Sequence, residues 1–121
     1  MNLILNHLNL CVPDVLDARQ FFETYFDFRC VDIKGDALAV LEGQNGFTLV
    51  LSNFTKDVMP VYPDAFHIGF IVERTDQVHA IYERLQQGGI EMEHEPRTMR
   101  GSLIFYCYAP GAILLEVSCR V

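Results

Sequence analysis

The sequence predicts an α+β fold built from two copies of a βαβββ unit. The order of expected strands and helices is the same in residues 1–54 and 65–121. Both halves start with a strand that begins with histidine and continues into an amphipathic helix. Residues 7–12 also align with 67–72, and residues 47–52 align with 113–118. An internal duplication is therefore expected.

In the first half we expect a strand near residues 3–12, a helix near 14–26 and strands near 28–34, 37–42 and 46–52. The helix follows Pro13, with Asp14 as its N-cap and Asp17 in its first turn. Apolar residues at helical spacing give it one buried face, made of Val15, Ala18, Phe22, Tyr25 and Phe26.

The second half repeats this order, with a strand near residues 65–73, a helix near 75–88 and strands near 90–95, 102–108 and 112–119. A linker over residues 55–64 contains Pro60 and Pro63. Repeats of roughly 55 residues bury little surface alone. We therefore expect the two repeats to pair their curved mixed sheets around a cavity, with the helices on the outer face.

Composition narrows the class of protein. Half of the residues are apolar, yet no window resembles a membrane span and the first twelve residues lack the basic start of a secretory signal. We expect a cytoplasmic protein without a membrane partner. Nine Lys and Arg against sixteen Asp and Glu give a net charge of −7, which disfavours nucleic acid. Four scattered cysteines are expected to be buried, reduced thiols.

Side-chain alternation places three ligand-type residues on the sheet face opposite the helices. His7 and His67 begin equivalent strands, and Glu116 lies between large apolar neighbours on the last strand. An ionised carboxylate there costs several kcal/mol unless it is paired or bound to a metal. Two imidazoles and a carboxylate suit one divalent ion, Fe, Mn, Ni, Co or Zn, with coordination positions left open.

Each of these residues also has a structural explanation. A histidine on a strand can serve as a hydrogen-bonded structural residue, and Glu116 can pair with Arg100 or Arg120. The equivalent positions of the two histidines in the repeats favour the metal site.

Three other candidates are interpreted as solvated. His79 is expected on the exposed side of a helix, and His94 lies between two glutamates near a strand end. Glu42 ends a strand before a glycine-rich turn, where a hairpin carboxylate is normally in water, with a role as a fourth ligand as the alternative.

Several short motifs, in their order and spacing, indicate a family. They are His7-Leu8-Asn9-Leu10 followed by Pro13-Asp14, then Phe66-His67-Ile68-Gly69-Phe70, then Phe105-Tyr106 leading through Pro110-Gly111 to Leu115-Glu116-Val117. Over essentially the whole chain, the sequence resembles the vicinal oxygen chelate superfamily, also called the glyoxalase/bleomycin resistance/dioxygenase family. The resemblance implies a single glyoxalase-like domain over residues 1–121.

The resemblance also implies a metal on the concave sheet face, held by His7, His67 and Glu116 and chelated by two oxygens of a substrate. Glyoxalase I enzymes add a carboxylate from the fourth strand, where Val50 stands here. Extradiol dioxygenases and fosfomycin-modifying thiol transferases are more similar in ligand set. The dioxygenases are longer, however, and the fosfomycin enzymes carry a lysine and serines before the seventh strand that this chain lacks.

By family position, Tyr106 is a candidate proton donor or oxyanion partner, and Arg100 is a candidate clamp for a carboxylate, phosphonate or enolate. We expect a metal-dependent lyase, transferase or dioxygenase that acts on a small oxygen-chelating molecule by isomerisation, thiol addition or oxygenation. The alternatives are a non-catalytic drug-sequestering protein of the bleomycin-resistance type and a structural relic. Family relatives also suggest a homodimer, with the site built within one chain or across swapped halves.

Overall fold

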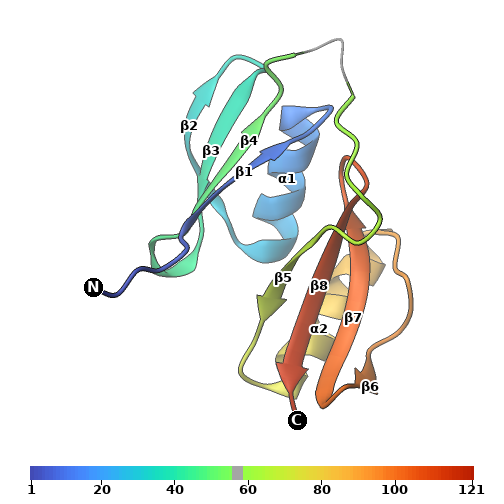
Figure 1. Ribbon diagram of the computed structural model, residues 1–121. Helices are drawn as coiled ribbons and strands as arrows, with labels where there is room; N and C mark the ends of the chain where they lie inside the picture. The colour runs from blue at the N-terminus through green and yellow to red at the C-terminus, as the bar shows by residue number, and fades with distance from the viewer. Residues whose placement is uncertain (56–58) are drawn as a thin grey trace. The chain divides into compact units, whose positions relative to one another are not determined.

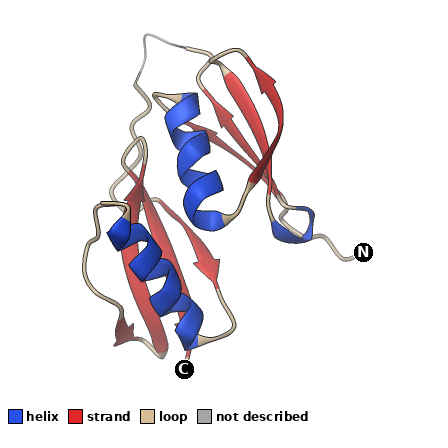
Figure 2. Ribbon diagram, turned by 180° about the vertical axis from the view of Figure 1, so that it is seen from behind, coloured by secondary structure: helices blue, strands red, loops and turns tan. Residues whose placement is uncertain are grey.

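Each half of the chain forms a four-stranded mixed sheet with one helix packed on one face (Figure 1). The computed structural model describes residues 1–55 and 59–121. The chain divides into a first unit, Met1–Val61, and a second unit, Tyr62–Val121. Seen from behind, each helix lies across its own sheet (Figure 2). The predicted α+β class and the repeated βαβββ order are confirmed. Part of the expected linker, residues 56–58, lies outside the described residues.

The first unit contains β1 (His7–Cys11), α1 (Val15–Phe26), β2 (Arg29–Lys34), β3 (Leu38–Glu42), a 3-10 turn (Gln44–Gly46) and β4 (Thr48–Ser52). Its strand order is β1-β4-β3-β2, with β1 and β4 parallel and the other pairs antiparallel. The carboxylate of Asp14 accepts a hydrogen bond from the backbone N–H of Asp17, so the predicted N-cap is confirmed.

The second unit contains β5 (His67–Ile71), α2 (Thr75–Gln87), β6 (Arg97–Met99), β7 (Ser102–Ala109) and β8 (Ile113–Arg120). Its order, β5-β8-β7-β6, matches that of the first unit, and β5 and β8 are parallel. Among the described residues, neither helix combines the length and the apolar character needed to span a bilayer.

The strand expected near residues 90–95 is misplaced, because the strand lies at Arg97–Met99. Arg100 and Gly101 both have positive φ, 51° and 77°, which makes a tight turn that pairs Met99 with Ser102. Pro96 has no N–H to donate, so the ladder is interrupted upstream of it. Met92 makes only an isolated bridge to Cys107.

Alternating burial separates the two faces of each sheet. In the second unit Phe105, Cys107, Leu115 and Val117 are fully buried, and Phe105 meets Tyr82 of α2 edge-on at 5.3 Å between ring centroids. The residues between them on β7 and β8 therefore face away from α2. His67 and Glu116, the two candidate ligands in this unit, alternate with the more buried residues of β5 and β8 and lie on this second face.

No disulfide joins the four cysteines, which all lie within the described residues, so the predicted thiol state is confirmed, whereas the predicted burial is wrong for Cys11. Cys107 and Cys119 are buried and Cys30 is half-buried, whereas Cys11 is exposed because it shares the outer alternation face of β1 with His7. Burial raises the pKa of the Cys107 thiol from 9.0 to about 12.

Candidate functional site

Glu116 is at the centre of the candidate site in the second unit. It lies on β8, whose neighbours are β5 and β7, and strand register places Gly69 on one side of it and Tyr106 on the other. Its side chain is 20% exposed, so the carboxylate is largely removed from water yet reachable. A group in this setting needs hydrogen-bond donors or a cation.

Two hydroxyl groups supply those donors. The phenol of Tyr106 donates to Oε1 of Glu116 at 2.9 Å, and Oγ of the buried Ser118 donates to Oε2 at 3.2 Å. Each carboxylate oxygen therefore has one donor and retains capacity for another partner. The ionic contact of Glu116 is with His67, and neither Arg100 nor Arg120 pairs with it in the described structure.

His67 presents one ring nitrogen to this carboxylate. Its Nε2 lies 3.8 Å from Oε1 of Glu116, and its Nδ1 lies 3.0 Å from the carbonyl oxygen of Ala65. Because a carbonyl only accepts, Nδ1 carries the proton, and in the neutral ring the Nε2 lone pair faces Glu116. Metal-binding histidines show this arrangement, with the second ring nitrogen donating to a carbonyl or carboxylate.

The spacing of these two atoms suits a shared ion. Two donors about 2.1 Å from a tetrahedral metal are roughly 3.4 Å apart. The observed 3.8 Å needs only a small side-chain rotation to reach that separation. The side chain of His67 is 46% exposed, so the approach is open on that side. His67 and Glu116 are therefore chemically suited to hold a divalent metal between them.

Gly69 keeps open the space beside Glu116. A Cβ built on Gly69 would lie 3.2 Å from the backbone oxygen, 3.4 Å from Cβ and 3.8 Å from Oε2 of Glu116. Sequence analysis did not single out this residue. An isolated glycine inside an apolar strand is nevertheless a known sign of close approach by another group.

Tyr106 behaves as a protonated donor at neutral pH. Partial burial raises the pKa of Tyr106, and the hydrogen bond and charge of Glu116 raise it further. The positive charge of Arg100 lowers the pKa of Tyr106 and so opposes these effects. Arg100 is an exposed residue on the turn between β6 and β7. The structure thus brings Tyr106 to the candidate ligands, and Arg100 acts on it electrostatically.

His94 is not a simple solvated residue. It is half-buried, and its ring meets that of Tyr106 at 6.0 Å between centroids and 74° between planes. Sequence reasoning missed this contact because it interpreted His94, which lies between two glutamates near an expected strand end, as solvated. His79 on α2 is exposed, as expected.

Next to this contact, the phenol of Tyr108 donates to Glu93, and this bond is the main reason that the pKa of Tyr108 is raised.

The other candidate residues lie in the first unit. His7 is exposed on β1, while Glu42 pairs with Arg29 at 3.3 Å, which agrees with its interpretation as a hairpin carboxylate. Val50 is half-buried opposite Asn9. Within either unit, over the residues that the structure describes, no three His, Cys, Asp or Glu side chains form a metal site alone.

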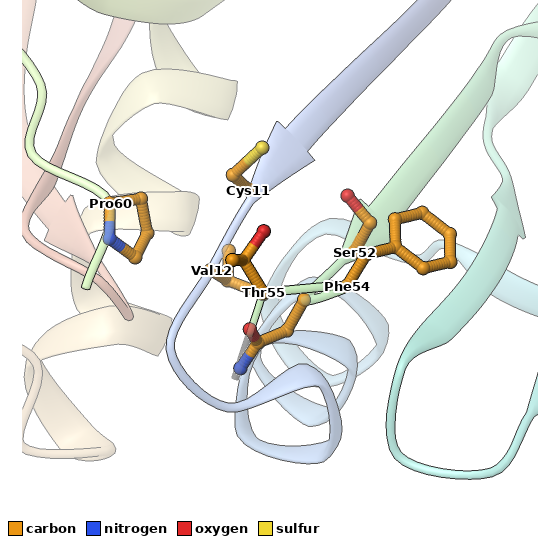
Figure 3. A pocket seen from close by; sticks show the side chains of 7 residues that line it. Cys11, Val12, Ser52, Phe54, Thr55 and Pro60 are labelled. Atoms are coloured by element: carbon orange, nitrogen blue, oxygen red, sulfur yellow. The ribbon is translucent and has the colours of Figure 1, made fainter. Parts of the chain in front are cut away.

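A small cavity of about 210 Å³ opens in the first unit where β1 and β4 end (Figure 3). Its lining comprises Cys11, Val12, Ser52, Asn53, Phe54, Thr55 and Pro60. No carboxylate, lysine or arginine is among these residues. The amide of Asn53 is already engaged, since its Nδ2 donates to the carbonyl of Pro13 at 2.7 Å. Such a surface suits a small, uncharged, partly apolar molecule.

A family model and solved structures point to the same protein family. The model of the Glyoxalase/Bleomycin resistance protein/Dioxygenase superfamily matches residues 4–117. The structure of a possible glyoxalase from Bacillus cereus is 38% identical, with a TM-score of 0.85, and the match covers 98% of this chain and 100% of that chain. No curated protein matches the sequence.

Two more distant structures share the fold. The fosfomycin resistance protein FosX from Listeria monocytogenes is 20% identical with a TM-score of 0.81, covering 100% of this chain and 96% of that chain. The lactoylglutathione lyase from Agrobacterium tumefaciens is 17% identical with a TM-score of 0.77, covering 96% and 92%. At these identities the likeness concerns the fold alone.

Proposed function

Because this chain belongs to the glyoxalase/bleomycin resistance protein/dioxygenase superfamily, we propose that it is a divalent-metal enzyme whose second unit supplies His67 and Glu116 as ligands. The observation that carries the proposal is the orientation of His67. Its Nδ1 donates to Ala65 and its Nε2 faces the Glu116 carboxylate at 3.8 Å. A structural histidine has no need to present a free lone pair to an acidic group.

When bound, a divalent ion polarises two substrate oxygens and stabilises the negative charge that develops on them. The chain's own residues prepare that step. Tyr106 and Ser118 hold the two oxygens of Glu116 and thereby fix the direction of its free lone pairs. Arg100, exposed near the phenol, is proposed to hold an anionic substrate group such as a carboxylate, phosphonate or enolate.

The proposed substrate is a small molecule with two adjacent oxygens, and the reaction is isomerisation, thiol addition or oxygenation. Membership in a superfamily that includes glyoxalases and dioxygenases supports this range, and the likeness to a possible glyoxalase from Bacillus cereus supports its glyoxalase part. Val50 supplies no carboxylate on β4. We therefore propose a site with three protein ligands and with the remaining positions open to substrate.

His7 is proposed as the third ligand, either from the same chain or from a second copy in a homodimer. Mixing His7→Ala with Glu116→Ala protein distinguishes the two. If halves are exchanged between chains, the mixture regains metal binding that neither variant shows. If the site is built within one chain, it regains none. Light scattering after size-exclusion chromatography measures the oligomeric state, and a monomer would exclude the exchanged arrangement.

The proposed function is tested by metal analysis and a substrate panel. Protein dialysed against Fe(II), Mn(II), Ni(II), Co(II) or Zn(II) should retain one ion per site. His67→Ala and Glu116→Gln should lose it, whereas His79→Ala, a change in an exposed helix histidine, should keep it. Catechols, hemithioacetals and epoxides with thiols are then assayed with the loaded protein. Stoichiometric metal in His67→Ala would contradict the ligand assignment.

A second candidate function is capture of a small molecule without chemistry. The cavity at the ends of β1 and β4 favours it, because the described residues of its lining include Phe54, Pro60 and Val12 beside hydroxyl groups, and none of these described residues is charged. Metal-free protein that binds uncharged aromatic compounds, and binds them more weakly when Ser52→Val narrows the cavity and removes the Ser52 hydroxyl, would support this reading. Unchanged binding in that variant would exclude the cavity.

A further inference from the structure

We propose that His94 is a positioning residue for this site, which it reaches through Tyr106. In this role His94 holds the phenol ring from the side opposite His67, so that the hydroxyl keeps its hydrogen bond to Glu116. The inference rests on the proposed function, in which Glu116 is a metal ligand.

Backbone pairing fixes the place of His94. The N–H of Glu93 donates to the carbonyl of Tyr106 at 2.9 Å, and the N–H of Tyr108 donates to the carbonyl of Glu91 at 3.3 Å. Met92 also bridges Cys107. Residues 91–93 therefore run beside β7 on the side away from β8, which places the next residue, His94, against the Tyr106 ring.

The ring of His94 is itself anchored. Its Nδ1 lies 2.7 Å from the carbonyl oxygen of Glu95, so this nitrogen donates and the ring direction is set. The side chain is half-buried, which restricts its rotamers. The His94 ring can therefore act as a rigid packing partner for the Tyr106 ring.

Tyr106 has an imidazole edge-to-face contact on each side. The centroid of His67 lies 6.1 Å from that of Tyr106 with planes at 85°, and that of His94 lies 6.0 Å away with planes at 74°. Both separations fall in the range of favourable aromatic pairs. His67 comes from β5, across β8, whereas His94 comes from the segment beyond β7. Together they limit rotation of the ring away from Glu116.

His94 affects the proposed ligand Glu116 through the hydrogen bond from Tyr106. The phenol donates to Oε1 of Glu116, the oxygen that faces Nε2 of His67. Without the His94 ring, the Tyr106 ring can rotate away from Glu116 part of the time. During that time Oε1 of Glu116 lacks the hydrogen bond from the phenol. Since partners of a ligand tune metal affinity, His94 should affect the metal without touching it.

Zn²⁺ and Ni²⁺ titrations of single and double variants test this route. His94→Ala should raise the dissociation constant by ~3–10-fold, a smaller effect than the loss of a direct ligand partner. His94→Phe keeps an aromatic ring against Tyr106 and should therefore bind metal with nearly wild-type affinity. His79→Ala is the matched control. In a Tyr106→Phe background, His94→Ala should add nothing, because the hydroxyl it positions is absent. An undiminished effect in that background, or no rescue by phenylalanine, would overturn the proposal.

A second readout does not depend on metal. In metal-free protein labelled with [13Cζ]tyrosine, the Tyr106 signal is assigned by its loss in Tyr106→Phe. The Glu116→Gln variant gives the chemical shift that the Tyr106 signal has when the hydrogen bond from its phenol is weakened. His94→Ala should move the signal toward that value, and His94→Phe should return it. A signal that stays at the wild-type position in His94→Ala refutes the inference even if the protein binds no metal, in which case the proposed function fails separately.

Discussion

Replacing Tyr106 by phenylalanine removes one hydroxyl group from the candidate site and little else. The ring, its contacts with His67 and His94, and the backbone pairing of β7 with β8 remain. What is lost is the 2.9 Å hydrogen bond to Oε1 of Glu116. The bond from Ser118 to the other oxygen is retained, so the carboxylate keeps one of its two donors.

The size of the effect follows from the exposure of the two partners. Mutation of an outer partner of a metal ligand typically costs ~10–100-fold in affinity, which corresponds to about 1.4–2.7 kcal/mol. Glu116 is 20% exposed and Tyr106 is half-buried, so water replaces part of the lost bond. We therefore expect Tyr106→Phe to weaken metal binding by ~10–30-fold, in the lower part of that range.

Isothermal titration with Zn²⁺ or Ni²⁺ measures this change, and Tyr108→Phe is the matched control. Tyr108 is two residues along the same strand, on the same face, and its hydroxyl donates to Glu93. Its loss should leave metal affinity within about twofold. If Tyr106→Phe binds metal as tightly as the wild type, or if both variants lose affinity equally, the assigned role of Tyr106 is wrong.

Other contacts give three further predictions. Gly69→Ala adds a methyl group 3.2 Å from the backbone oxygen and 3.8 Å from Oε2 of Glu116, so metal affinity should fall while the protein stays folded by circular dichroism. The raised pKa of Cys107 means that the unfolded chain loses its thiol proton first as the pH rises. The stability that the protonated Cys107 thiol confers is therefore complete below pH 9 and is lost progressively as the pH rises toward 12. Urea unfolding should show this alkaline loss reduced in Cys107→Ala but not in the exposed Cys11→Ala. Asp14→Ala removes the N-cap of α1 and should cost ~1 kcal/mol in the same assay.

Three results would contradict these expectations. Unchanged or tighter metal binding in Gly69→Ala would show that the space beside Glu116 is not needed. Identical alkaline slopes in Cys107→Ala and the wild type would mean that another group titrates. An Asp14→Ala variant as stable as the wild type would show that the hydrogen bond to the Asp17 N–H contributes nothing net.

The repeated fold could be predicted because its evidence is local. Period-two alternation on β5 and β8 placed His67 and Glu116 on the face opposite the helix, and the structure has them there. The cap at Asp14 was likewise a short-range pattern. The second strand of the second unit, β6, was misplaced, since two consecutive positive φ angles at Arg100 and Gly101 decide where it pairs.

The neighbours of the carboxylate could not be predicted from spacing. Ser118 lies two residues from Glu116, yet whether it donates to Oε2 depends on side-chain rotamers. His94 seemed solvated because its neighbours are glutamates, whereas its contact with Tyr106 arises from pairing of residues 91–93 with β7. The hydrogen bond from Nδ1 of His67 to the carbonyl of Ala65 orients the ring and thereby directs the lone pair on Nε2. This bond depends on the turn before β5.

Residue types and their periodicity were thus enough to give the two sheets, their helices and the face on which the ligand-type side chains lie. These properties depend on steric preferences that act over a few neighbouring residues. Tertiary structure decided which donors reach Glu116, which nitrogen of His67 is free and which histidine supports Tyr106. Those outcomes depend on strand register and on contacts within a few ångströms between residues distant in the chain, and no short stretch of sequence encodes such distances.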